Sequence, residues 1–290
     1  MAGTEAPDGV RFEHSGSLAQ RALQLLASGP RTTPEMAAQV MGISGGGAAA
    51  ARAIWALLGC DPRFAVSGEG VWSLAEAQAP ALRPLRQEEW VVVDFETTGG
   101  SPSGGHRVTE VAAVRVSGGR IVDSYSTLVN PERRIPGMIT SITGITQQMV
   151  ECAPCFREVA HRVGEAVGGA VFVAHNAAFD WRFLCHEMEM ATGVKPAGRQ
   201  LCTVKVARKL LAHLPSRGLD ALSVYFGLEI ENRHRALDDA VATAHVLLRL
   251  IDMLEDRGVQ DWESLEALLG RRKPKPSRKR AASPRSMEVA

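Results

Sequence analysis

The sequence has no long apolar run, no secretory leader and few cysteines. A membrane-spanning helix needs about 20 consecutive apolar residues, and no stretch of the chain approaches that length. Residues 1–14 lack the basic-then-apolar pattern of a signal peptide. The five cysteines are odd in number and scattered, and the Cys152–Cys155 pair has no second pair at metal-binding spacing. We therefore expect a cytoplasmic protein without a membrane anchor, in which these two cysteines are incidental.

The chain also has almost no net charge, but its charges are unevenly distributed. The formal net charge is +1 over 290 residues, whereas residues 271–290 carry eight Arg and Lys against one Glu. This segment therefore has a net charge of +7, and the rest of the chain has −6. We predict a disordered basic tail over 271–280 that adds salt-dependent affinity for nucleic acid. A solubility tail that contacts nothing is the alternative.

The N-terminal part of the chain predicts a small helical domain that ends in a hairpin. Apolar residues recur at helical spacing from Leu18, and Pro34 suits the first turn of a second helix. A third helix is predicted over about 48–58. Residues 63–66 and 71–74 flank a Ser-Gly-Glu-Gly turn, which is typical of a hairpin. Three helices followed by a hairpin resemble a winged helix-turn-helix domain.

This small domain carries few of the side chains that read a DNA sequence. Base readout uses Arg, Lys, Asn or Gln on the recognition helix, but the predicted third helix offers one charged side chain, Arg52. Residues 15–77 contain four Arg and four acids, so they have no basic footprint. We favour a docking or auxiliary role, and non-specific contact with DNA through the wing stays open.

The second part of the chain predicts an α/β domain with a mixed sheet. Residues 90–93 form an apolar run typical of a central strand, and 108–116 and 120–129 flank a Ser-Gly-Gly hairpin turn. Helices and strands alternate beyond this hairpin. The further predicted elements are helices over 156–167, 178–190, 202–211 and 237–254 and a buried strand over 170–174.

Two carboxylates stand two residues apart where the predicted central strand leaves the core. Side chains at this spacing, Asp94 and Glu96, point to the same face of a strand. They repel one another, and a divalent cation would relieve the repulsion. An Asp-x-Glu pair alone is common, but here Thr97, Thr98 and Gly99 follow. Glycine lets the backbone turn sharply, so that N–H groups can approach a nucleotide.

Two further acids and a histidine accompany this pair. Asp180 opens the helix after the strand over 170–174, a position that would bring it towards Asp94. Asp239 lies near the start of the last long helix, off its apolar stripe. Each acid could instead complement a helix dipole, and the loop residue His234 could be a solvated bystander. Beside an acid cluster, however, a neutral histidine can accept a proton from water, and carboxylates without a Cys/His cage favour Mg²⁺ or Mn²⁺ over Zn²⁺.

The three motifs together resemble the DEDDh exonuclease superfamily, which comprises 3′→5′ exonucleases with a ribonuclease H-like fold. The motifs are Asp-Phe-Glu-Thr-Thr-Gly at 94–99, His-Asn-Ala-Ala-Phe-Asp at 175–180 and His-Arg-Ala-Leu-Asp-Asp at 234–239. Ile-Thr-Gly-Ile-Thr at 142–146 is similar to a family segment beside the nucleotide site. The resemblance spans about 90–252 and is closest to the branch of the proofreading (epsilon) subunit of bacterial DNA polymerase III.

The resemblance implies a role for each matched residue. Asp94 would bridge two Mg²⁺ or Mn²⁺ ions, and Glu96 and Asp239 would bind the ion that activates water. Asp180 would act on the second ion, and His234 would be the general base. The implied substrate-binding residues are Thr97, Thr98, Thr143, Ile145, Asn176 and Phe179.

The function implied is metal-dependent release of nucleoside monophosphates from single-stranded DNA 3′ ends, in proofreading or repair beside a polymerase or repair protein. Two alternatives stay open. One is an exoribonuclease of the same fold, because nothing in the sequence decides whether a 2′-hydroxyl is read. The other is a non-catalytic adaptor, which loss of an acid or of the histidine would favour.

The predicted divisions are a flexible leader over 1–14, a winged-helix-like domain over 15–76, a linker over 77–88, a ribonuclease H-like α/β exonuclease domain over 89–254, and a short helix with the basic tail over 255–290.

Overall fold

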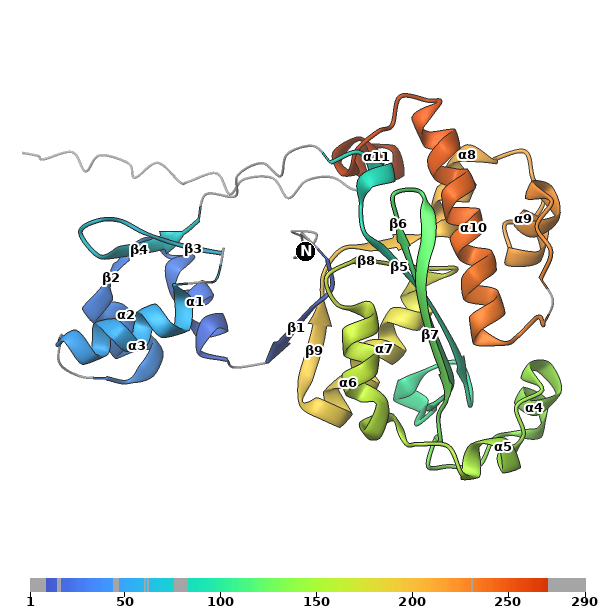
Figure 1. Ribbon diagram of the computed structural model, residues 1–290, viewed down its shortest axis with the longest axis horizontal. Coiled ribbons are helices and arrows are strands. Elements are labelled where there is room, and N and C mark those ends of the chain that lie inside the picture. The colour runs from blue at the N-terminus through green and yellow to red at the C-terminus, as the bar shows by residue number, and fades with distance from the viewer. Residues whose placement is uncertain are drawn as a thin grey trace, which may run out of the picture.

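The computed structural model describes two groups of elements, a small one near the N-terminus and a larger one around a five-stranded sheet (Figure 1). No helix in the part of the chain that it describes is long and apolar enough to span a bilayer. The described residues are 9–14, 17–43, 47–59, 61, 63–75, 83–230 and 232–270. The predicted basic tail and residues 1–8 of the predicted leader therefore lie outside the described residues.

The five-stranded sheet has the order β10-β8-β5-β6-β7. Its central strand β5 (Trp90–Thr97) pairs antiparallel with β6 (Val108–Ser117) and parallel with β8 (Val171–Ala174). The outer strands are β7 (Arg120–Leu128) and β10 (Gln200–Cys202). The mixed sheet, the central strand and the β6–β7 hairpin confirm the sequence-based predictions. A central strand buried on both faces explains why residues 90–93 are uniformly apolar.

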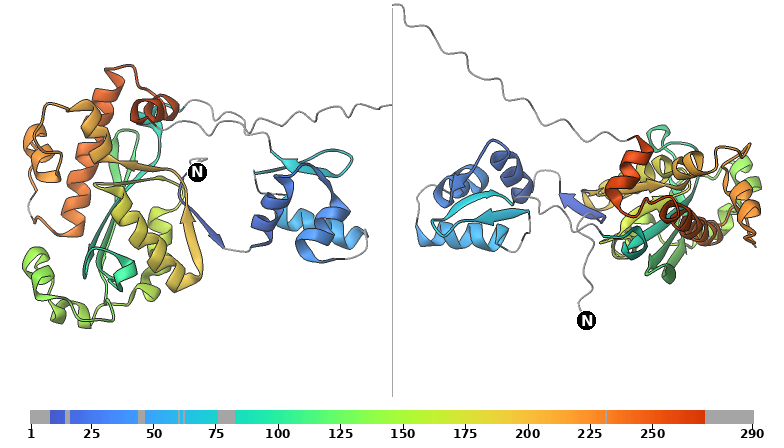
Figure 2. Two further views of the ribbon diagram at one scale, coloured as in Figure 1. Left: turned by 180° about the vertical axis from the view of Figure 1, so that it is seen from behind. Right: turned by 90° about the horizontal axis from the view of Figure 1, so that it is seen from above.

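Helices cover both faces of this sheet (Figure 2). Alternate residues of β5 divide between the two layers because successive side chains point to opposite faces. Val92 packs in the core formed with the α8 and α10 helices, whereas Val91 and Val93 pack in the core formed with α6 and α7. The bounds of these helices, all of which the sequence predicted, are α6 (Phe156–Val167), α7 (Ala177–Thr192), α8 (Thr203–Leu210) and α10 (Ala236–Glu255).

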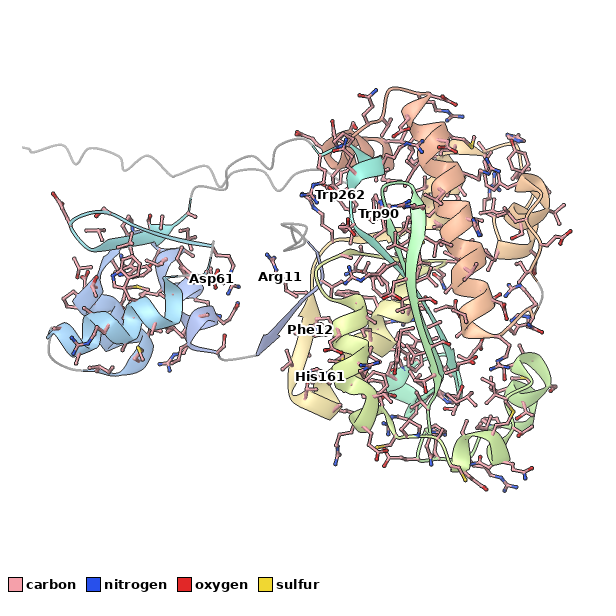
Figure 3. The ribbon with its side chains drawn as sticks, in the orientation of Figure 1. Arg11, Phe12, Asp61, Trp90, His161 and Trp262 are labelled. Carbon is pink, nitrogen blue, oxygen red and sulfur yellow. The ribbon has the colours of Figure 1, made fainter. Side chains whose placement is uncertain are left out.

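The prediction of a loose leader over 1–14 is wrong for its last residues. β1 (Arg11–His14) pairs antiparallel with β9 (Val194–Ala197), and Val10 is 2% exposed with its N–H bonded to Ala170 O at 2.7 Å. Figure 3 shows the Phe12 side chain turned towards α6. The ring lies over Gly164 of that helix. These residues belong to the larger group of elements because strand pairing and apolar burial hold them there.

The prediction of a linker over 77–88 is also wrong at its C-terminal end. Leu85 is fully buried, and its N–H donates to Gln260 O at 2.7 Å. Trp90 Nε1 donates to Leu85 O at 3.0 Å, and the Trp90 and Trp262 rings lie 6.3 Å apart (Figure 3). These contacts tie the segment to the C-terminal end of the larger group. The remaining elements of that group are η1 (Leu85–Gln87), η2 (Pro102–Gly104), α4 (Gly137–Thr143), α5 (Gln147–Glu151), α9 (Leu219–Phe226) and α11 (Trp262–Leu269).

The small group contains the three helices and the hairpin that the sequence predicts, with one more short strand in a sheet of order β2-β4-β3. Trp72 is 1% exposed, and its Nε1 donates to Thr33 Oγ1 at 3.0 Å, which joins the hairpin to the second helix. Glu35 caps that helix by accepting from Thr32 N at 2.7 Å. The elements are α1 (Leu18–Leu26), β2 (Arg31–Thr32), α2 (Thr33–Met41), α3 (Ala48–Leu58), β3 (Phe64–Val66) and β4 (Val71–Leu74).

Candidate active site

Carboxylates from β5, α7 and α10 meet at the C-terminal end of β5. Phe95 packs with the α6–α7 layer, so strand alternation places Asp94 and Glu96 on the opposite side, towards α10. Asp180 opens α7 and is 3% exposed. Its Oδ1 accepts from Phe95 N at 3.2 Å, which fixes it beside Asp94. The predicted approach of Asp180 to the end of the central strand is therefore present in the structure.

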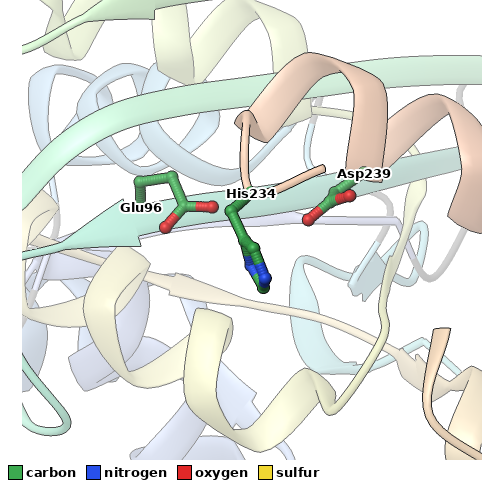
Figure 4. A group of neighbouring side chains, drawn as sticks. All are labelled: Glu96, His234 and Asp239. Atoms are coloured by element: carbon green, nitrogen blue, oxygen red, sulfur yellow. The ribbon is translucent and has the colours of Figure 1, made fainter. Parts of the chain in front are cut away.

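Glu96, His234 and Asp239 lie close together within this cluster (Figure 4). Each offers one ligand atom, and these atoms all lie within 4.8 Å of one another. Asp239 occupies the first turn of α10 and is 4% exposed, while His234 sits in the preceding loop at a φ of 64°. The positive φ turns the chain sharply just ahead of the helix, which brings the imidazole next to the two carboxylates.

The carboxylates raise one another's pKa. Burial, followed by the charges of Asp180 and Asp239, raises the pKa of Asp94 well above its usual value. Burial and the charge of Asp94 raise the pKa of Glu96 to about 9. Burial likewise raises the pKa of Asp180 to about 8. When several neighbouring carboxylates are buried, ionising all of them without a positive charge nearby costs free energy, so their pKa values rise.

The donors of the cluster fit divalent cations. Most of them are carboxylate oxygens, the ligands that Mg²⁺ and Mn²⁺ take, and the His234 imidazole lies beside them. Asp239 Oδ1 is buried and accepts no hydrogen bond within the described residues, although buried carboxylate oxygens are ordinarily paired. The raised pKa values and this unpaired oxygen both fit a site shaped for a cation.

Sequence reasoning missed Glu110, which holds the loop that carries His234. Glu110 is 4% exposed on β6, directly opposite Glu96 in the strand register. Its carboxylate accepts from Arg235 Nη2 at 2.6 Å, from Arg235 Nε at 3.1 Å and from Ala236 N at 3.0 Å. A charged residue within the apolar run over 108–116 was the signal that could have found it, since lone charges are rare in buried strands.

Sequence reasoning also missed Arg233, a cation that pairs with one of the acids. Its guanidinium forms ion pairs with Asp239 and with Asp220 in the first turn of α9. Its charge lowers the pKa of Asp239, against the larger effect of burial, and also lowers the pKa values of Asp94 and Glu96. Arg233 therefore provides part of the counter-charge that the cluster requires.

The predicted substrate-binding residues fall into two groups. Four lie at the end of β5 or the start of α7, and two lie at or just after the end of α4. Thr97 and Thr98 leave β5 beside the cluster, and Thr98 Oγ1 accepts from Arg107 N at 3.0 Å, which fixes the turn. Asn176 has a φ of 86° at the start of α7 and forms no side-chain cap hydrogen bond.

The structure does not bring Ile145 to an open surface. This residue is fully buried with Ile135 and Val150, while Ile142 in the same segment is 49% exposed. The neighbouring Thr143 turns inward as well, and its Oγ1 accepts from Ile145 N at 3.1 Å. Phe179 is partly buried, with its ring 5.0 Å from that of Phe183.

A mixed sheet covered by helices, with clustered carboxylates and a histidine at the end of its central strand, defines an α/β protein with a candidate site for divalent cations. Residues 91–247 match the RNase T family model, which is described as an exonuclease. The chain belongs to this exonuclease family, part of the DEDDh superfamily, whose members employ divalent metal ions. The resemblance found in the sequence motifs is thereby confirmed.

Comparisons with individual proteins agree with this assignment. The chain is 43% identical over 185 residues to a DNA polymerase III subunit epsilon-like protein of Rhodobacter capsulatus, a match that covers 62% of this chain and 26% of that protein. It is 36% identical over 170 residues to a 3′-5′ exonuclease, DinG, of Bacillus subtilis, covering 59% and 18% of the two chains. The chain thus spans about a quarter or less of these curated relatives.

A solved structure supports the fold alone. The E. coli exonuclease I crystallised with a dT13 oligonucleotide superposes with a TM-score of 0.52 at 18% identity, covering 59% of this chain and 43% of that chain. The ribonuclease H-like mixed α/β fold predicted from the sequence is therefore confirmed.

Proposed function

We propose that this protein is a metal-dependent 3′→5′ exonuclease that releases nucleoside monophosphates from DNA 3′ ends. The observation that carries the proposal is the convergence of Glu96, His234 and Asp239 within 4.8 Å, beside Asp94 and the buried Asp180. The relatives named for DNA polymerase III and for 3′-5′ exonuclease activity support both the polarity and the substrate.

The carboxylates would hold two Mg²⁺ or Mn²⁺ ions, which supply the positive charge that stabilises the attacking and leaving oxygens of an in-line displacement. The charges of both Asp180 and Asp239 act on Asp94, so Asp94 is suited to bridge the ions. His234 would accept the proton of the attacking water at a ring nitrogen, because its imidazole lies beside the carboxylates that would hold the ions. Glu110 would hold the His234 loop in place through Arg235.

The terminal nucleotide would lie against the turn after β5. Thr97 and Thr98 begin that turn, and Gly99 packs so closely on the His106 ring that an added Cβ would come within 2.3 Å of it. Only glycine fits there, which lets the backbone N–H groups approach a ribose. Ile142, exposed in the segment after β7, would take the base-packing role that the sequence suggested for Ile145.

We further propose that the small group of elements is a winged-helix-like domain with a docking role, for a polymerase or repair partner. Its third helix exposes Trp55 at 52% and has Arg52 as its one charged side chain, which suits a protein contact better than base readout. The exonuclease domain predicted over 89–254 would then also include residues 9–14 and 83–88.

The direct test is digestion of matched DNA and RNA oligonucleotides, 5′-labelled to follow polarity, with Mg²⁺, Mn²⁺ or EDTA. We expect stepwise shortening of single-stranded DNA from its 3′ end with metal, none with EDTA, and none when the 3′ end is blocked. Faster digestion of RNA would favour the exoribonuclease alternative. No digestion of either polymer by wild type, under conditions in which it binds Mn²⁺, would contradict the proposal and favour the adaptor.

A further inference from the structure

A basic pocket of about 410 Å³ lies beside the acidic cluster, between the end of α8, the loop before α9 and His175. Arg208, Ser216 and Arg217 line it, together with Gly218 at the start of α9. No acidic side chain lines this pocket within the described residues. It is therefore a candidate anion site that the catalytic machinery does not use.

The polar groups of the pocket have unused hydrogen-bonding capacity. Arg208 is exposed and forms no hydrogen bond or ion pair within the part of the chain that the structure describes. Arg217 Nη2 donates to Leu211 O and Ala212 O at 3.1 and 2.6 Å, while its Nε is buried without a partner. No side chain caps the N-terminus of α9, where Gly218 lies. Two guanidinium groups and an uncapped helix start suit a phosphate, which can accept hydrogen bonds from both.

His175 makes the inner wall of the pocket neutral. Its Nδ1 lies 2.8 Å from Thr203 Oγ1, and its Nε2 is buried beside the Arg217 backbone without completing a hydrogen bond. Burial lowers the pKa of His175 to about 4, so the ring is uncharged near pH 7. The positive charge of the pocket therefore comes from the two arginines.

The pocket and the turn after β5 lie on opposite sides of the acidic cluster. On one side, Thr98 N donates to Arg107 O at 2.8 Å, next to β6. On the other side, β8 pairs with β5 so that Val173 lies opposite Val92, which puts His175 level with Asp94. Arg233 pairs with Asp239 of the cluster and with Asp220 of α9, the helix whose start lines the pocket.

We propose that this pocket binds the phosphodiester next to the scissile one, on its 5′ side. The inference rests on the proposed function, in which the scissile phosphate lies at the acids and the terminal nucleotide lies at the β6 side. The bound DNA strand would then leave the acids towards β8, where Arg208 and Arg217 would contact its next phosphate. A dinucleotide has no phosphate that reaches the pocket, whereas a trinucleotide does. The minimum substrate for full efficiency is therefore a trinucleotide.

The test combines a neutral phosphate analogue with Arg208→Ala in the full-length protein. A methylphosphonate replaces the second phosphodiester from the 3′ end of a short single-stranded DNA, and release of the first mononucleotide is followed with Mg²⁺. In wild type we expect about a tenfold loss of kcat/KM, appearing mainly in KM, as for a hydrogen bond to a charged group. Arg208→Ala should cause a smaller loss and should reduce the further loss caused by the methylphosphonate, because only Arg217 then remains to contact the charged phosphate. Lys209→Ala, its exposed neighbour outside the pocket, should behave as wild type.

A dinucleotide substrate separates this role from a general one. Arg208→Ala should leave dinucleotide cleavage unchanged. Equal losses on dinucleotide and trinucleotide, or equal sensitivity of wild type and Arg208→Ala to the methylphosphonate, would overturn the pocket assignment. Anisotropy measured in EDTA gives the same comparison for binding without cleavage. Cleavage of the unmodified oligonucleotide by wild type tests the proposed function separately, so the two ideas can fail independently.

Discussion

Glu110 and Arg235 join the start of β6 to the loop ahead of α10 through two hydrogen bonds, at 2.6 and 3.1 Å. The carboxylate also accepts from Ala236 N, so it fixes both the side chain and the backbone that follow His234. Glu96 lies opposite Glu110 in the pairing of β5 with β6. This strand pair therefore carries one carboxylate of the candidate centre and also holds the loop that contains His234.

This relationship predicts that Glu110→Gln lowers kcat by at least about tenfold, since a buried charge-assisted pair contributes about 1.5–3 kcal/mol to the geometry it holds. The loss should fall on kcat with little change in oligonucleotide affinity, because Glu110 contacts the loop and not the strand. Steady-state kinetics and anisotropy separate the two. Glu132→Gln, an exposed acid of another loop, is the control. Loss of affinity with normal kcat would contradict a positioning role.

Removal of any one of the acids should nearly abolish digestion. We expect this for Asp94→Ala, Glu96→Ala, Asp180→Ala and Asp239→Ala, because members of one metal cluster act as a unit and their losses are not additive. The matched control is Asp238→Ala, next to Asp239 in the same helical turn, which should retain most activity. Circular dichroism confirms that each variant is folded. Wild-type rates from two of the four variants would remove the cluster from catalysis.

Stability without metal should decrease as the pH rises. The folded-state pKa values of Glu96 and Asp180, about 9 and about 8, exceed their ordinary values of 4.5 and 3.8. The folded state therefore binds more protons than the unfolded state between about pH 4 and 9, and the free energy of unfolding falls across that range. Thermal unfolding in EDTA should show this fall, and Mn²⁺ should reverse it at pH 8. A melting temperature in EDTA that rises from pH 5 to 8 would contradict the electrostatic account.

His234→Ala should slow turnover by about 10²–10⁴-fold, the usual effect of losing a general base, while metal binding persists. The pH dependence of the rate should differ between the variant and wild type, because the group that accepts the proton contributes to that profile. His161→Ala serves as the control because that side chain is 84% exposed. If the variant kept the pH–rate profile of wild type, another group would have to accept the proton.

Truncation after Gly270 should weaken binding to nucleic acid at low salt and flatten its salt dependence. Residues 271–280 carry seven Arg and Lys, which displace counterions from phosphates. Turnover at saturating substrate should change little, since no candidate site residue lies in this segment. Anisotropy over a salt series compares the two proteins, and equal slopes would leave the tail with no part in binding.

The parts of the site that the sequence predicts are those that repeat a local pattern. Asp94 follows a buried apolar run, and Asp180 and Asp239 occupy first turns of helices, so strand and helix periodicity locate all three. Asp94 and Asp180 lie close together because β5 pairs parallel with β8, the strand that precedes α7. The alternation of helices and strands in the sequence suggests this pairing.

The features that the sequence did not predict depend on contacts between distant residues. Glu110 and Arg235 are 125 residues apart in the chain, and no periodicity connects them. β1 forms only through β9, a strand that also escaped prediction because each is four residues long. Ile145 matches a motif, but its burial is decided by the packing of Ile135 and Val150.

The pairing of β1 with β9 makes the small group of elements an insertion with two attachments to the same body. The chain leaves the exonuclease fold at His14 and returns to it at Pro84, where a bridge to Asp261 holds it. A ligand held by the inserted part is thus confined near the nuclease, at an effective concentration on the order of millimolar for short connections. Two attachments also restrict rotation, so that capture of a partner would present it from a narrow range of directions.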